Sequence, residues 1–168
     1  MESLRVRLDR EREADEIVLV RDRVPDCAQA LFLRGTDMQN LTVIDDRIES
    51  QAVVNELDAH ELGHHRNTVQ DIFANLPRDL FSVDPRLAGK IEARADREAV
   101  SITVSPERII EAYAEGCREP WEFAEALEIT ERAFVDGVEL QQHRFGTRAF
   151  YYLGYCLTFE PLSIMLAG

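Results

Sequence analysis

The sequence contains few cysteines and few basic residues. Its three cysteines, Cys27, Cys117 and Cys156, are odd in number and scattered, so no disulfide framework or cysteine metal site is apparent. We expect free thiols in a reducing compartment. Lysine and arginine total 19 against 32 aspartates and glutamates, which gives a net charge of −13. Because phosphate binding depends on basic side chains, we expect no direct contact with nucleic acid or anionic membranes.

Long apolar runs are also missing. The N-terminal segment MESLRVRLDREREADE is charged throughout and lacks the apolar centre of a secretory signal. The C-terminal segment TRAFYYLGYCLTFEPLSIMLAG (147–168) is apolar but is interrupted by Gly154, Glu160 and Pro161. It therefore falls short of the roughly 18 consecutive apolar residues that indicate a membrane-spanning helix. We expect a cytoplasmic protein that does not associate with membranes.

The order of hydrophobic patterns predicts an α+β fold, with a short antiparallel sheet packed on a helix. Segment 67–89 contains three loop-favouring residues, Pro77, Pro85 and Gly89, and is predicted to be mostly loop, although VQDIFANL (69–76) is compatible with one short turn. Ser50 is a plausible N-cap for a helix, and Ser105 followed by Pro106 is typical of a helix start. The expected helices are 2–14, 50–66, 87–103 and 107–116, and the expected strands are 16–22, 30–35 and 41–46.

The C-terminal third divides into two further units. Residues 118–146 have the pattern of a helix-turn-helix, with a turn at Ile129-Thr130; its predicted packing residues are Trp121, Phe123, Ala124, Leu127, Phe134, Val138 and Leu140. Segment 107–146 holds ten acidic residues against four arginines, a net charge of −6, so a structural or partner-docking role is favoured over DNA binding. Residues 1–117 are expected to form the core domain. The pattern of residues 147–168 predicts a β-hairpin that packs on this core or on a partner such as a second copy of the chain.

The segment NELDAHELGHHRN (55–67) holds three of the four histidines. Val53, Leu57, His60 and His64 share one stripe of the predicted helix, so the two histidines are expected to face inward. Side chains four residues apart on a helix lie close enough to bind one metal ion. Glu61 follows His60 directly and so lies one residue round the helix from it. This position suits a carboxylate that does not bind the metal but takes a proton from metal-activated water. We therefore predict a Zn²⁺ site.

A third protein ligand is needed, and Glu92 in KIEARADREAV is the best candidate. Asp96, four residues later on the same face, is suited to accept the second N–H of a ligating histidine. Small residues Ala93, Ala95 and Ala99 would let this helix approach its neighbour closely, whereas Arg94, Arg97 and Glu98 are expected to point away.

Simpler interpretations exist for each of these residues. His60 and His64 could be core residues bonded to backbone, although two imidazoles and a carboxylate are costly to bury without a cation. Glu92 and Asp96 could form a solvated helix face. His65 and His143 are expected at the surface.

The stretches DAHELGHHR, IEARADREAV and SPERIIEAYAEGCREPWEFAEALEITERAFVDGVELQQHRFG resemble the ImmA/IrrE family of small metallopeptidases from phages and integrative elements, over residues 40 to 165. The resemblance implies a zincin-like metallopeptidase fold, with His60, His64 and Glu92 as zinc ligands and Glu61 as the catalytic residue. Glu98 stands where relatives usually have an aromatic residue, and TVSP replaces their proline-containing L-x-P.

The expected function is therefore zinc-dependent cleavage of a peptide bond. By the resemblance, the substrate is a helix-turn-helix repressor of a phage or mobile element. LTVID (41–45) is the predicted edge strand to which an extended substrate adds by backbone pairing. The alternative is a non-proteolytic regulator whose zinc is structural and whose acidic surface sequesters a partner; a closed site with four protein ligands would favour it.

Overall fold

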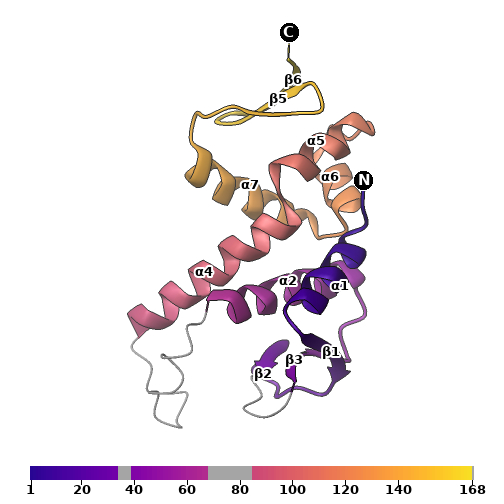
Figure 1. Ribbon diagram of the computed structural model, residues 1–168, viewed down its shortest axis with the longest axis vertical. Helices are drawn as coiled ribbons and strands as arrows, with labels where there is room; N and C mark the ends of the chain where they lie inside the picture. Colours follow the sequence, from indigo (N-terminus) through magenta and orange to yellow (C-terminus); the bar gives the residue numbers. More distant parts are fainter. Residues whose placement is uncertain (34–38, 68–84, 168) are drawn as a thin grey trace.

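The computed structural model describes residues 1–33, 39–67 and 85–167. It has the predicted α+β composition, with the long helices α2 and α4 crossing between a small sheet at each end (Figure 1). The expected turn at 69–76 lies outside the described residues. In chain order the elements are α1 (Leu4–Ala14), β1 (Ile17–Asp22), β2 (Ala30–Leu33), β3 (Asn40–Asp45), α2 (Gln51–Asn67), α4 (Pro85–Thr103), α5 (Pro106–Ala114), α6 (Pro120–Leu127), α7 (Glu131–Phe145), β4 (Phe150–Tyr152), β5 (Tyr155–Phe159) and β6 (Leu162–Leu166).

The N-terminal sheet is mixed, so the prediction of an antiparallel sheet was wrong. Its strand order is β1-β3-β2: β3 runs parallel to β1 and antiparallel to β2. The segment between β1 and β2 contains Pro25 and is too long for a tight hairpin, and it carries the chain to the far side of β3. β3 is thus the central strand, with Thr42 and Ile44 buried. The prediction that LTVID is an edge strand was also wrong.

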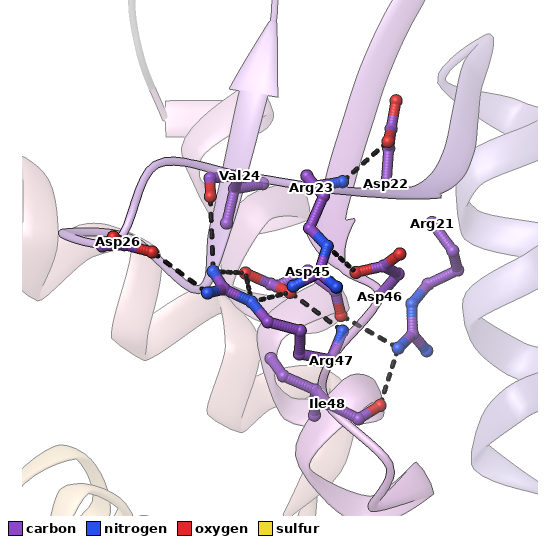
Figure 2. A network of polar contacts seen from close by, with 9 residues as sticks. All are labelled: Arg21, Asp22, Arg23, Val24, Asp26, Asp45, Asp46, Arg47 and Ile48. Atoms are coloured by element: carbon purple, nitrogen blue, oxygen red, sulfur yellow. Dashed lines mark hydrogen bonds and ion pairs between the residues drawn. The ribbon is translucent and has the colours of Figure 1, made fainter.

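Polar contacts fix the turn that leads from β3 into α2 (Figure 2). Arg47 Nε donates to Asp45 Oδ1 at 2.8 Å, and Arg47 Nη1 donates to Asp26 Oδ1 at 3.0 Å. Arg21 Nη2, from β1, donates to the carbonyl oxygens of Asp45 at 2.9 Å and Ile48 at 2.6 Å. The hydrogen bonds from Arg47 hold the pKa of Asp45 well below its usual range. This network joins the ends of β1 and β3 and thereby orients the start of α2.

One hydrophobic core joins the elements on both sides of the α2–α4 crossing. Leu4 and Leu8, four residues apart on α1, are fully buried, as their spacing predicts. Gly137 of α7 fits against Val104, where an added Cβ would come 2.8 Å from a Val104 methyl carbon. The core includes side chains from all three segments predicted above, 1–117, 118–146 and 147–168. Its largest fully buried members are Leu4, Leu8, Leu62, Ile109, Ile110, Leu127, Leu157 and Phe159.

Helices α6 and α7 form the expected helix-turn-helix unit. Glu128 takes a left-handed conformation at the end of α6, with φ 59°, and Thr130 caps α7 by accepting the Ala133 N–H at 3.2 Å. The rings of Phe123 and Phe134 stack with centroids 5.2 Å apart. Trp121, predicted to pack inside, is instead 55% exposed in the first turn of α6.

The C-terminal segment forms a three-stranded antiparallel sheet, β4-β5-β6, one strand more than the predicted hairpin. Leu157 and Phe159 of β5 are fully buried, so the segment completes the core, as expected. Tyr151 and Met165 flank Cys156 on the opposite face and are 67% and 57% exposed. Pairing of this face with a second copy stays a prediction. Within the described ranges, no helix combines the length and the apolar character needed to cross a membrane.

Candidate metal centre

Helix α2 carries the histidine motif. The helix begins beside Ser50, as predicted: the Ser50 carbonyl accepts the Val54 N–H at 3.0 Å. His60 and His64 lie one turn apart with ring centroids 4.6 Å apart, and both are half-buried. The buried face of α2 is one residue further round the helix than the sequence predicts, and it includes Glu61 and Leu62. The two imidazoles therefore lie at the edge of the core, where they can reach a neighbouring helix and solvent.

A close crossing of α2 and α4 brings the two halves of the site together. The crossing point is Gly63 against the backbone of Ala95, where a Cβ on Gly63 would come 2.5 Å from the Ala95 carbonyl oxygen. Ala95 is completely buried. This supports the prediction that small residues allow close approach, and it adds Gly63, which sequence reasoning did not single out. Glu92 and Asp96 flank Ala95 and thus face the histidines.

Three donor atoms converge between the helices. His60 Nε2 lies 3.3 Å from Glu92 Oε2, His64 Nε2 lies 3.5 Å from the same oxygen, and the two Nε2 atoms are 3.0 Å apart. A tetrahedral zinc ion with ligand bonds of about 2.0–2.1 Å separates its ligand atoms by about 3.3–3.4 Å. The triangle has nearly these dimensions, and the predicted trio is a group among the described residues that could hold a metal ion. The donor set fits zinc and also other divalent metals.

The hydrogen-bond partner of His60 and the pKa of His64 suit metal binding. His60 Nδ1 lies 3.1 Å from Asp96 Oδ1, the carboxylate predicted to accept its N–H. Since an ionised carboxylate can only accept, it favours the tautomer with the proton on Nδ1 and a lone pair on Nε2. Burial, and then the nearby His60, lower the pKa of His64. The lowered pKa favours the neutral form of His64, the form that ligates metals.

Glu61 lies beside the triangle but is much more enclosed than Glu92. The Glu61 residue is 7% exposed, whereas the Glu92 side chain is 57% exposed. Burial is the largest influence on the Glu61 carboxyl and raises its pKa, while His60 and a hydrogen bond from the backbone of Phe32 act in the opposite direction. Phe32 lies in β2, the strand on the outer side of the central β3. The edge strand beside Glu61 is therefore β2.

Comparison of this chain with protein-family models, with curated proteins and with solved structures found no match. The site therefore rests on its own geometry.

Arg66 forms ion pairs that link the helices around the candidate metal centre. It lies two residues after His64, and its guanidinium contacts Glu11 at 2.7 Å, Asp15 at 2.8 Å and Glu98 at 3.1 Å. Arg66 thereby joins α1, α2 and α4. Glu98, expected to point away, instead turns back toward α2 because it pairs with Arg66.

A buried ion pair supports α2 from the side of α1. Arg12 of α1 pairs with Asp58 of α2, and both residues are buried. Burial lowers the pKa of Arg12, opposed by the nearby Asp9. No local pattern marked this pair, because it joins residues far apart in the sequence.

The remaining histidines lie outside the triangle. The ring of His65 packs edge-on against Phe32, with centroids 5.2 Å apart, so His65 belongs to the α2–β2 contact and is only half-exposed. His143 is exposed on α7, as predicted.

A mostly apolar hollow of about 460 Å³ opens beside the centre. His60 and Asp96 are among its polar lining residues, and Leu57, Ala99 and Leu140 contribute apolar surface from α2, α4 and α7. A pocket of this composition can hold an apolar side chain close to the candidate metal ligands.

Proposed function

We propose that this chain is a zinc-dependent endopeptidase with a zincin-like arrangement of the ImmA/IrrE type. The observation that carries the proposal is the triangle of His60 Nε2, His64 Nε2 and Glu92 Oε2, with sides of 3.0, 3.3 and 3.5 Å, next to the enclosed Glu61. Within the described part of the chain, the trio supplies three protein donors. Three ligands are typical of catalytic zinc, which keeps its fourth position for water or substrate.

The chain's own residues have distinct roles in this proposal. When bound, zinc supplies Lewis-acid chemistry: it lowers the pKa of water and polarises a carbonyl group. Asp96 orients His60 through Nδ1, so that Nε2 points to the metal position. Glu61 accepts a proton from the attacking water on its carboxylate and delivers it to the leaving amine. Burial raises the pKa of Glu61 and so makes its carboxylate a stronger base than an exposed one.

Strand β2 is suited to hold an extended substrate. One edge of β2 pairs with β3, and its other edge carries no strand in the described sheet. Leu33 is 47% exposed at the end of β2. A substrate backbone added along this edge would lie near Glu61, which the Phe32 backbone contacts. By the family resemblance, we propose that the substrate is a helix-turn-helix repressor of a phage or mobile element.

The proposal is tested with a mixed peptide library from a digested proteome. Zinc-loaded protein is incubated with the library, and newly formed N-termini are identified by mass spectrometry. We expect new termini with the native chain, and none with Glu61→Gln or after chelation. Zinc must still bind to Glu61→Gln, because Glu61 is not a ligand. Cleavage that persists in Glu61→Gln would refute the role of Glu61, and a native chain that binds zinc without cleaving any peptide would favour the regulator.

A further inference from the structure

A second hollow, of about 620 Å³, has a charge opposite to that of the whole chain. It is lined by four arginines, Arg66, Arg94, Arg97 and Arg144, and by one acidic residue, Glu98. The chain as a whole carries a net charge of −13. A cluster of arginines on a protein of net negative charge attracts anionic ligands and raises their concentration near the cluster. We refer to this hollow as the arginine groove.

Among the described residues, most of the positive charge in the groove has no acidic partner. Arg66 is matched by Glu11, Asp15 and Glu98. Arg94 and Arg97 form no ion pair with any described residue, and the guanidinium of Arg144 lies over the ring of Phe145, 5.2 Å from its centroid. Three guanidinium groups, from α4 and α7, thus line this hollow without an ion-pair partner in the described part of the chain.

The arginine groove adjoins the candidate metal centre. Arg94 and Arg97 lie on α4, the helix that also carries Glu92 and Asp96. The groove shares Val100 and Leu140 with the apolar hollow that His60 lines. A chain segment bound in the arginine groove can thus continue along α4 toward the metal ligands.

We infer that the arginine groove binds a short acidic peptide segment, with two or three carboxylates that flank the cleaved part of the substrate. Guanidinium groups pair with carboxylates through two parallel hydrogen bonds, which gives orientation as well as affinity. Nucleic acid is disfavoured because its many phosphates would extend beyond three arginines onto a surface of net negative charge. The assignment of this segment to a substrate rests on the proposed endopeptidase function; the binding itself does not.

The test is direct binding, measured by fluorescence anisotropy on the full chain carrying Glu61→Gln so that cleavage does not interfere. The probe is a fluorescein-labelled peptide with three glutamates in a glycine-serine context, and its partner probe has glutamines instead. The groove variant is Arg94→Gln, Arg97→Gln, Arg144→Gln. The control variant is Arg23→Gln, Arg132→Gln, Arg148→Gln, which changes the net charge equally at exposed positions elsewhere.

We expect the groove variant to bind the acidic peptide at least about tenfold more weakly, because several charge-assisted hydrogen bonds are lost. The control variant should change affinity less than about twofold, and added salt should weaken binding. Equal binding of the glutamine peptide, or equal loss in both variants, would overturn the inference. Tighter binding of a labelled single-stranded oligonucleotide through the same three arginines would overturn it in favour of nucleic acid. Measurements with and without zinc separate this result from the proposed function, since peptide binding does not require the metal.

Discussion

Gly63 of α2 lies directly against Ala95 of α4, with no room for a side chain between them. A Cβ on Gly63 would come 2.5 Å from the Ala95 carbonyl oxygen and 2.9 Å from its Cα. Both obstructing atoms belong to backbone, so a rotamer change cannot relieve the clash. Since His60 and His64 flank Gly63 while Glu92 and Asp96 flank Ala95, the distance between the helices sets the size of the triangle of candidate ligand atoms.

Gly63→Ala should therefore both destabilise the fold and weaken metal binding. Overpacking typically costs about 1–3 kcal/mol of unfolding free energy, measured by urea denaturation, and we expect zinc affinity to fall in a competition titration. Gly89→Ala is the matched control, because a Cβ at this position of α4 meets no atom of the described residues within 4 Å. It should stabilise the protein by roughly 0.5–1 kcal/mol, the usual gain of alanine over glycine in a helix. Unchanged stability and zinc affinity in Gly63→Ala would contradict the close crossing.

Asp96→Asn should weaken zinc binding without abolishing it. An asparagine side chain at this position could present its amide nitrogen toward His60 Nδ1, and it lacks the charge that makes the imidazole a better ligand. Loss of such an outer partner typically lowers metal affinity about 10- to 100-fold. The measurement is a competition titration with a chelating dye, with Asp46→Asn, an exposed change just after β3, as control. Equal affinities in the two variants would show that Asp96 has no part in the centre.

Glu61→Gln should stabilise the metal-free protein at neutral pH. Burial raises the pKa of Glu61 above its ordinary value of 4.5, so the folded state holds this proton more tightly than the unfolded state. The ionised, buried carboxylate then costs stability, and the cost develops as the pH rises above 4.5. Glutamine carries no charge at any pH, so the gain in stability should grow with pH. Each kcal/mol gained raises the melting temperature by roughly 2–4 °C in a chain of this size.

Thermal melts of the chelated native and Glu61→Gln proteins at several pH values check this prediction. The two melting temperatures should converge in acid. A native protein that is the more stable of the two at neutral pH would mean that the Glu61 carboxylate is favourably paired, and not merely desolvated.

The sequence was most informative where structure depends on near neighbours. The helices from Gln51, Pro106 and Glu131 begin at or within a residue of positions marked by Ser50, Ser105 and the Ile129-Thr130 turn, because caps and helical periodicity are local. The same locality placed His60 and His64 on one stripe. Glu92 and Asp96 were predicted because a metal centre demands a third ligand and an outer acceptor, and both lie beside the histidines.

Features that depend on the path of the chain in space were missed. The parallel pairing of β1 with β3 is decided by where the chain crosses the sheet, which strand patterns do not encode. The contact of Phe32 with Glu61 and the pair Arg12–Asp58 join distant segments, so no spacing rule marks them. The helix-turn-helix pattern placed Trp121 among the packing residues, although its position on α6 leaves it 55% exposed.

The metal content of the chain tests the central claim most directly. Native mass spectrometry after zinc reconstitution would be applied to the native protein, His60→Ala and Glu61→Gln, with His143→Ala as the control at an exposed histidine. We predict one zinc per chain in all but His60→Ala, which should hold none. Zinc retained by His60→Ala, or absent from the native protein at neutral pH, would contradict a metal centre built from His60, His64 and Glu92.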